Sequence, residues 1–255
     1  MVYTLAVKMP CFDAHDHLQS YATEAELEAS LAAAAAAGVQ GMLCCGTCPE
    51  DWARVLEIAG RYQGVRPAFG LHPWFSAEGG WLEKLEEFLR RCPAACVGEI
   101  GLDGVKQRPG QEEDFKAQLE LAERFRRPAV LHCVQNWGRL LELLKKNRLP
   151  AFMLHAYGGS PEMVKELAGL GAYFSFGGEL TSPGRDKLRA ALAAVPRDRL
   201  LFETDAPATG GAPWHAGPAG VTEVVTAAAG ELGLPPEELA AISLTNTERF
   251  LGELQ

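Results

Sequence analysis

The sequence predicts an α/β protein folded as a single (β/α)8 barrel. Short runs of β-branched or aromatic residues alternate eight times with longer helical patterns along the 255 residues. These short runs mostly lack polar alternation, as expected for a parallel sheet that is covered by helices. Such a barrel takes up about 250 residues, and no linker rich in Pro, Ser or Gly divides the chain. We therefore expect one domain over residues 1–255.

The expected elements follow one another with connections of a few residues. Strands are expected at residues 12–14, 39–44, 68–71, 96–98, 129–131, 151–154, 173–176 and 200–202. Helices are expected at 24–37, 52–62, 81–91, 111–126, 137–147, 161–169 and 186–195, with one or two more in 235–251. In the first helix, three Glu residues precede an Ala-rich stretch that ends at Gly38, a pattern typical of an amphipathic helix with a glycine stop.

Composition and charge exclude several classes of protein. The 47% apolar fraction is ordinary for a globular chain, which excludes overall disorder and a coiled coil. The formal charge of −9 disfavours a surface that grips long nucleic acids or an anionic membrane. No segment approaches the roughly 18 apolar residues of a membrane helix, and Lys8 and Pro10 interrupt the first apolar stretch. We expect a cytoplasmic protein with no membrane association and no obligate protein partner.

The seven cysteines are an odd number scattered through the chain, so a disulfide framework is not expected. Cys45 and Cys48 have the CxxC spacing of a redox pair or of half a zinc site. No second CxxC and no nearby histidine completes such a site. The other interpretation is that small residues close a strand here.

Chemically capable side chains stand at the carboxyl ends of seven expected strands. They are His15 and His17, Cys45, His72, Glu99, His132, His155 and Asp205. In a (β/α)8 barrel the strand ends converge on one mouth, where active sites form. Residues far apart in the sequence are therefore expected to meet.

The histidines have the pattern of metal ligands. His15 and His17 are two residues apart, so an extended strand presents both on one face, and neutral imidazole commonly binds divalent cations. His132 and His155 each end an apolar strand. Taken singly, each of these two could equally be a hydrogen-bonded core histidine, but five of the six histidines lie at strand ends.

Two carboxylates complete the set. A buried carboxylate such as Glu99 is costly unless it is paired or bound to a metal, and its two oxygens can bridge two cations. Asp205 follows the last strand, where the alternative role is an N-cap. Four histidines, one Glu and one Asp suit one or two ions of Zn²⁺, Mn²⁺ or Mg²⁺. The chemistry expected of such a centre is attack by metal-activated water on phosphorus or a carbonyl carbon.

The segments around these residues resemble the TatD family of metal-dependent hydrolases. The matching segments are residues 12–18, 70–74, 97–103, 111–119, 131–132, 154–155, 174–178, 201–207 and 245–250. The resemblance implies a TIM barrel in which His15, His17 and Asp205 hold one metal, Glu99 bridges, and His132 and His155 hold the second. It also implies catalytic roles for Asp205 and Glu99, with Asp205 orienting or deprotonating the attacking water.

For the substrate, the resemblance implies phosphodiester hydrolysis at a small or single-stranded nucleic-acid end, because family members are described as deoxyribonucleases. His72 matches a family histidine near the pocket and is assigned to substrate contact; its alternative is a capping role before Pro73. The sequence departs from the family pattern at 133–136, where relatives carry an arginine, and at 208–218, where they carry a basic stretch. Trp214 and His215 could replace those contacts, or belong to an ordinary loop.

These departures leave two alternatives. One is a divergent hydrolase of the same barrel class that acts on a lactone, an amide or a small phosphoester. The other is a non-catalytic metal-binding scaffold, which the complete set of six ligand residues disfavours.

Overall fold

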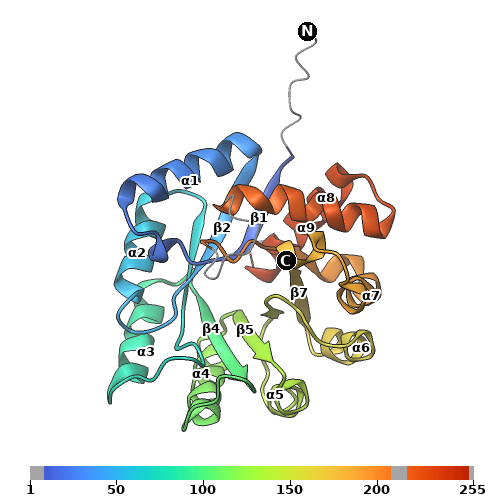
Figure 1. The fold of residues 1–255 in the computed structure, drawn as a ribbon. Coiled ribbons are helices and arrows are strands. Elements are labelled where there is room, and N and C mark those ends of the chain that lie inside the picture. The colour runs from blue at the N-terminus through green and yellow to red at the C-terminus, as the bar shows by residue number, and fades with distance from the viewer. Residues whose placement is uncertain (1–8, 208–216, 253–255) are drawn as a thin grey trace.

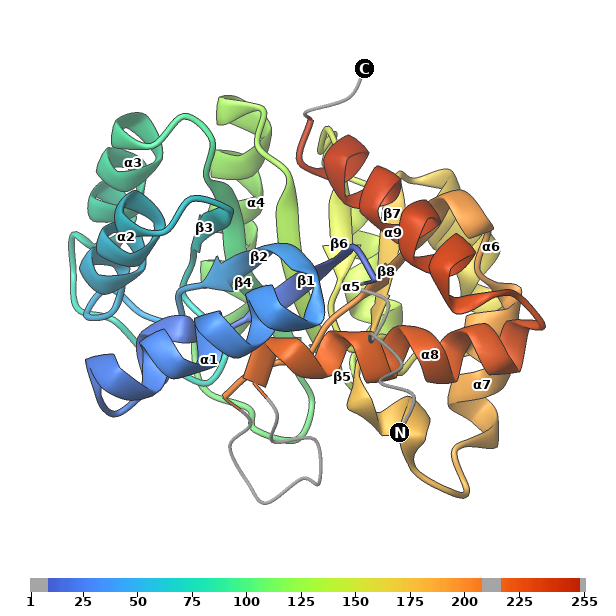
Figure 2. The ribbon, with the colours of Figure 1, turned by 90° about the horizontal axis from the view of Figure 1, so that it is seen from above.

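The computed structural model describes residues 9–207 and 217–252. Its eight strands form one parallel sheet in chain order, β1 to β8, which curves into a nearly closed barrel surrounded by helices (Figures 1 and 2). The strands are β1 (Cys11–Asp16), β2 (Val39–Cys45), β3 (Val65–Phe69), β4 (Cys96–Asp103), β5 (Ala129–Val134), β6 (Phe152–Leu154), β7 (Ala172–Phe176) and β8 (Leu200–Phe202). The predicted (β/α)8 barrel is confirmed.

The α-helices alternate with the strands, and the last two follow β8. They are α1 (Glu24–Ala37), α2 (Trp52–Arg61), α3 (Trp81–Arg91), α4 (Gln111–Phe125), α5 (Trp137–Leu144), α6 (Pro161–Gly169), α7 (Asp186–Ala194), α8 (Val221–Leu232) and α9 (Pro236–Phe250). None of the helices in the described residues combines the length and the hydropathy needed to cross a bilayer.

Helix α8 is an α-helix that the sequence did not predict. Its residues include five Val or Thr side chains, which have low helix propensity. In the fold, the buried face of α8 packs against β1, β8 and α9. Tertiary packing, rather than local propensity, therefore stabilises α8. In α1, by contrast, a capping box between Thr23 and Glu26 marks the start of the helix in the sequence itself.

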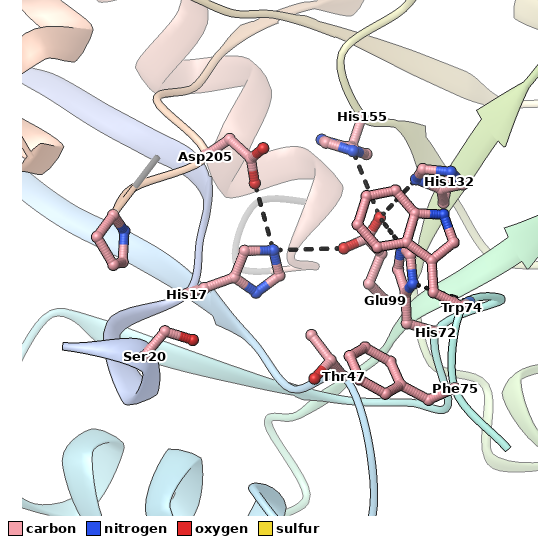
Figure 3. A pocket seen from close by; sticks show the side chains of 11 residues that line it. His17, Ser20, Thr47, His72, Trp74, Phe75, Glu99, His132, His155 and Asp205 are labelled. Carbon is pink, nitrogen blue, oxygen red and sulfur yellow. Dashed lines mark hydrogen bonds and ion pairs between the residues drawn. The ribbon is translucent and has the colours of Figure 1, made fainter. Parts of the chain in front are cut away.

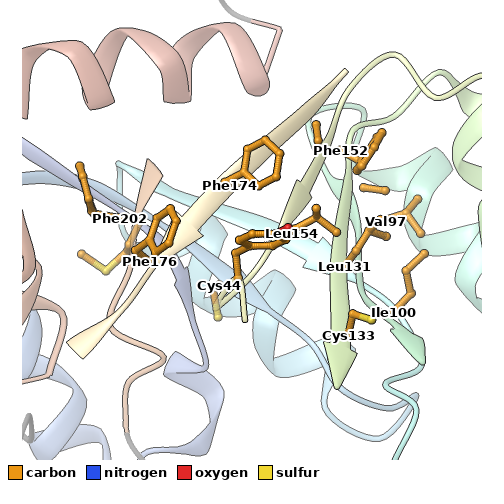
Figure 4. Packing of buried hydrophobic residues seen from close by; sticks show 14 of the residues in the cluster. Cys44, Val97, Ile100, Leu131, Cys133, Phe152, Leu154, Phe174, Phe176 and Phe202 are labelled. Atoms are coloured by element: carbon orange, nitrogen blue, oxygen red, sulfur yellow. The ribbon is translucent and has the colours of Figure 1, made fainter. Parts of the chain in front are cut away.

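Two apolar layers hold the barrel together. The larger lies between strands and helices and includes Val97, Leu131, Phe152 and Phe174 (Figure 4). The other fills the barrel with Ala14, Leu43, Cys45, Ala68, Cys96, Val130, Met153, Tyr173, Leu201 and, from α9, Phe250. Each fully buried Leu or Phe contributes about 1.5–3 kcal/mol, and the result is a rigid frame for the strand ends.

The segment after β8 closes the barrel against β1. The Asp205 amide donates to the His15 carbonyl at 3.0 Å, and the His17 amide donates to the Ala206 carbonyl at 2.6 Å. Buried Asp13 accepts the Thr204 amide at 2.9 Å and also bonds the Thr204 hydroxyl. These bonds place Asp205 beside the two histidines of β1.

Candidate metal centre

A pocket of about 260 Å³ opens at the carboxyl ends of the strands. Its lining includes His17, His72, Glu99, His132, His155 and Asp205 (Figure 3). His15 lies fully buried behind them and contacts Glu99. All the residues that the sequence singled out as metal, catalytic or substrate residues thus meet in one place.

Four of these side chains converge on one point. The His15 Nε2 atom lies 3.2 Å from His17 Nε2, 3.3 Å from Glu99 Oε2 and 3.6 Å from Asp205 Oδ1. The His17 Nε2 atom lies 3.5 Å from Glu99 Oε2 and 3.2 Å from Asp205 Oδ1. Ligands bound tetrahedrally to one ion at about 2.0–2.2 Å are about 3.3–3.6 Å apart. The spacing of these nitrogen and oxygen donors therefore fits one divalent ion.

The second oxygen of Glu99 faces a different group. Its Oε1 atom lies 3.0 Å from His132 Nδ1, 3.4 Å from His155 Nε2 and 3.2 Å from His72 Nε2. The two oxygens of a single carboxylate are thus shared between two sets of imidazoles. This arrangement fits a carboxylate that bridges two cations.

Hydrogen bonds behind three histidines turn a lone pair toward the pocket. In each ring the nitrogen that faces away from the pocket has a partner. His17 Nδ1 lies 2.7 Å from the Cys45 carbonyl oxygen, His132 Nε2 lies 3.1 Å from Asp103 Oδ2, and His155 Nδ1 lies 3.0 Å from Glu203 Oε1. A neutral imidazole that donates on one side carries its lone pair on the other. In their neutral forms, these three rings would therefore have the tautomer that a metal ligand needs.

His72 has the opposite tautomer. Its Nδ1 atom accepts the Trp74 backbone N–H at 3.2 Å, so its Nε2 carries the proton and points at Glu99 Oε1. His72, Glu99 and His132 could be grouped as a metal site by distance alone, but this tautomer favours a donor to substrate or to Glu99. The same bond gives the ring the local capping role that the sequence left open.

The pKa values of the carboxylates reflect the surrounding imidazoles. Burial alone would raise the pKa of Glu99, but His72, His155 and His15 hold it well below its usual value. Burial likewise opposes ionisation of Asp205, and His17 lowers its pKa to about 2. Both groups are therefore ionised near neutral pH.

The histidines divide into two classes. Burial is the largest influence on the pKa of His15 and of His72, and it lowers both. Burial also disfavours the charged forms of His17 and His155, but the carboxylates outweigh it. Asp205 and Glu99 raise the pKa of His17, and Glu203 and Glu99 raise that of His155 to about 10. Divalent ions would take the place of these two protons.

Strand alternation accounts for the placement of His132 and His155 but not for that of His15 or Glu99, which lie beside irregularities in strand pairing. His132 and His155 follow the interior residues Val130 and Met153 by two positions, so their side chains point inward. Glu99 does not follow this alternation. Val97 and Ile100 both belong to the helix-facing layer although they are three positions apart, so the alternation is interrupted between them. An irregularity in strand pairing between Val97 and Ile100 turns Glu99 into the mouth.

A glycine permits the close approach of β4 and β5 beside the site. Gly101 has φ of +155°, and a Cβ atom there would lie 2.0 Å from the His132 carbonyl oxygen. No larger residue fits without moving the strand. Gly101 lies within the matching segment 97–103, but the sequence alone does not reveal this role.

No role was predicted for Asp103, Glu203 or Trp74, although all three lie in segments that match the family. Asp103 and Glu203 raise the number of acidic side chains at the centre from two to four. Two divalent cations contribute +4 and these four carboxylates −4, so the excess of about +2 expected from Glu99 and Asp205 alone disappears. Attraction of an anionic substrate therefore depends on other groups.

The CxxC pair does not form part of this centre. Cys45 is fully buried in the barrel, and burial raises the pKa of its thiol well above the usual value. In the parts of the chain that the structure describes, the candidate metal clusters contain no cysteine. The interpretation as small residues closing a strand is favoured. Trp214 and His215 lie outside the described residues.

Comparisons with known proteins show which family the chain resembles. A family described as "TatD related DNase" matches residues 12–252. The chain is 37% identical over 203 residues to the uncharacterized metal-dependent hydrolase YjjV of Escherichia coli, covering 76% of this chain and 78% of the relative. It is 34% identical over 207 residues to the 3′-5′ ssDNA/RNA exonuclease TatD of Klebsiella pneumoniae, covering 77% and 78%.

Solved structures of other proteins have the same fold. The crystal structure of YjjV from E. coli superposes with a TM-score of 0.87 at 33% identity, covering 96% of this chain and 98% of that one. A TatD family protein from Entamoeba histolytica has the same fold, with a TM-score of 0.81 at 17% identity and coverage of 95% and 98%. The chain belongs to the TatD family of metal-dependent hydrolases.

Proposed function

We propose that this hydrolase cleaves phosphodiester bonds at the end of a single-stranded nucleic acid, as a single-domain enzyme over residues 1–255. The main support is the position of Glu99, whose two oxygens face two separate sets of imidazoles. That arrangement suits a two-metal centre, the common solution for in-line displacement at phosphorus. We infer the substrate class from relatives that are named 3′-5′ ssDNA/RNA exonucleases.

The residues divide the work as follows. His15, His17 and Asp205 would hold one divalent ion, His132 and His155 the other, and Glu99 would contact both. Ions held there supply Lewis-acid polarisation of the phosphoryl group and lower the pKa of water. Zn²⁺, Mn²⁺ and Mg²⁺ all accept such ligands.

Asp205 is placed to act on the attacking water. Its side chain is 51% exposed toward the pocket, while the other proposed ligands are largely buried. Its low pKa keeps it ionised, so an oxygen can accept a hydrogen bond from the attacking water and orient it; we propose that it also accepts the proton of that water. His72 donates from Nε2 and is placed to contact an oxygen of the substrate.

One observation favours the second candidate, a hydrolase of a small lactone, amide or phosphoester. Among the described residues that line the pocket, none is Lys or Arg. Phosphate is usually held by such side chains, and the residue that follows His132 is the buried Cys133. A neutral electrophile would not need a cation there.

A substrate panel distinguishes the two. Protein loaded with Zn²⁺ or Mn²⁺ is assayed on single-stranded oligonucleotides, a lactone, an amide and an aryl phosphoester. We expect release of mononucleotides from the oligonucleotides. Turnover of the small compounds without any attack on nucleic acid would support the second candidate. Protein that binds no ion when either metal is supplied would contradict both.

A further inference from the structure

One edge of the pocket is apolar and exposed. Among the described residues, the exposed large hydrophobic side chains are Trp74, Phe75 and Val105, with exposed fractions of 44%, 41% and 63%. All three lie on the loops after β3 and β4, and Trp74 and Phe75 line the pocket beside His72 (Figure 3). Exposed apolar side chains gathered at one place mark a binding surface. We refer to Trp74, Phe75, Val105 and Lys106 as the aromatic rim.

The aromatic rim is fixed to the metal centre through one carboxylate. Asp103 Oδ2 accepts the Trp74 indole N–H at 2.6 Å and lies 3.1 Å from His132 Nε2. Asp103 Oδ1 accepts the backbone amides of Val105 and Lys106 at 2.7 and 2.8 Å. The Trp74 ring and the Lys106 loop are therefore held in a set position relative to a proposed metal ligand.

Further bonds lock the two loops together. The Arg108 Nε and Gln111 Nε2 atoms both donate to the Pro73 carbonyl, at 3.0 and 3.1 Å. Gln118 of α4 bonds both the amide and the carbonyl of Leu71. A surface that is already ordered loses little entropy when a ligand binds.

The rim also supplies the positive charge that the pocket wall lacks. The Lys106 Nζ atom lies 3.3 Å from the centroid of the Trp74 ring, a cation–π contact. The 44% exposure of Trp74 is measured with Lys106 in that position. The rim therefore offers an aromatic surface and a cation together, which matches a base and its neighbouring phosphate.

We propose that the aromatic rim stacks against an unpaired base of a nucleic-acid strand whose scissile phosphodiester lies at the metal centre, with Lys106 beside the next phosphate. This inference rests on the proposed function. The centroids of Trp74 and His132 are 5.9 Å apart, so a base on the rim belongs to a nucleotide adjoining the reacting one. Stacking on an aromatic ring accepts any base but needs its face free, so the rim selects single strands.

The test is a binding measurement on the metal-loaded protein. Fluorescence anisotropy is measured with a single strand whose phosphorothioate linkages resist cleavage, and with a matched strand that lacks the last two bases at each end. We expect the complete strand to bind about tenfold more tightly or better. Trp74→Ala should bring this ratio close to one. Trp74→Phe, which keeps the ring but loses the bond to Asp103, should retain most of it.

Lysine variants test the second part of the rim. Lys106→Ala should weaken binding of both strands several-fold and reduce the salt dependence by about one charge. Lys165→Ala, on the exposed side of α6, is the charge-matched control and should change neither. Equal effects of the two lysine variants would remove Lys106 from the site.

The outcomes separate the rim from the proposed function. If the wild type binds the complete and the base-lacking strand equally, the base-stacking proposal is wrong. It is also wrong if Trp74→Ala and Trp74→Phe lose the preference for the complete strand equally, because Trp74 would then act only through Asp103. A change of oligomeric mass in Trp74→Ala would assign the rim to a second copy of the chain and overturn the base platform. A wild type that shows the ratio but cleaves no unmodified strand supports the rim and contradicts the proposed phosphodiesterase.

Discussion

The two halves of the metal centre share Glu99 but differ in what stands behind their histidines. In the β5–β6 half, His132 contacts Asp103 and His155 contacts Glu203. In the β1 half, made of His15, His17 and Asp205, a backbone carbonyl stands behind His17. The Nδ1 atom of buried His15 has no hydrogen-bond partner within the described residues.

This difference separates holding a metal from handling a substrate. A carboxylate behind an imidazole fixes its orientation and increases its basicity, which strengthens metal binding. We therefore expect the β5–β6 half to bind its ion more tightly. The β1 half contains the half-exposed Asp205, the one proposed ligand that water and substrate reach easily. Its weaker support suits a site that exchanges ligands during turnover.

The largest effect is expected from removing the residue that the halves share. Glu99→Gln replaces one carboxylate oxygen with an amide N–H donor, which cannot bind a cation. We expect kcat/KM to fall about 10³-fold or more and the bound metal to fall in both halves. Steady-state kinetics and elemental analysis check this, with Glu162→Gln on the surface of α6 as the control. Full metal content with activity within tenfold of the wild type would show that the halves are independent.

Asp205→Asn should affect the β1 half alone. The amide no longer accepts a proton from water, so we expect kcat to fall about 10²–10⁴-fold, while the ion of the β5–β6 half stays bound. Single-turnover kinetics together with metal content measure both effects. Asp198→Asn, at the opposite end of β8 from Asp205, is the matched control. A kcat within threefold of the wild type would contradict the role of Asp205.

Glu203→Gln tests the support behind the β5–β6 half. Glutamine still accepts a hydrogen bond but loses the charge, so we expect about 10–100-fold weaker binding of one ion. Competition with a chelator measures the affinity of each site, again with Glu162→Gln as the control. If both ions weaken equally, or if only the weaker-binding one is affected, the proposed difference between the halves is wrong.

Much of this centre follows from the sequence because strand ends converge in a barrel. His132 and His155 end uninterrupted apolar strands, so alternation and topology together place them in the mouth. Glu99 was assigned through its cost of burial, and that assignment does not depend on strand geometry. Alternation from Cys96 would have turned Glu99 toward the helices; the irregularity beside Ile100 reverses it.

The supporting residues could not be separated from ligands by sequence alone. Glu203 and Asp205 are both carboxylates after β8 and are two positions apart, so strand alternation would put both on the same face. One contacts a histidine from behind and the other faces the pocket, because His155 lies between Glu203 and Glu99. Trp74 looks like any loop tryptophan until its indole is seen on Asp103. Such roles depend on which side chain lies next to a shared partner, and only the folded structure shows that.

The smallest expected effect is a reversal of pH dependence between the metal-free and metal-loaded protein. In the metal-free protein, the raised pKa of His155, about 10 against 6.5 ordinarily, adds stability that is fully present below about pH 6.5 and is lost as the pH rises toward 10. Metal binding requires neutral imidazole, so metal-loaded protein gains stability over the same rise. We expect the Tm of chelated protein to fall by at least about 2 °C, equivalent to roughly 1 kcal/mol, and that of loaded protein to rise.

Calorimetry between pH 6.5 and 9.5, with and without chelator, measures the two slopes. His155→Gln should flatten the slope of the chelated protein because it removes the group that holds the extra proton. The Lys165→Ala variant controls for a general change of charge. Parallel slopes for chelated wild type and His155→Gln would show that the proton on His155 contributes nothing to folding. The carboxylates behind the β5–β6 half would then act only when an ion is bound.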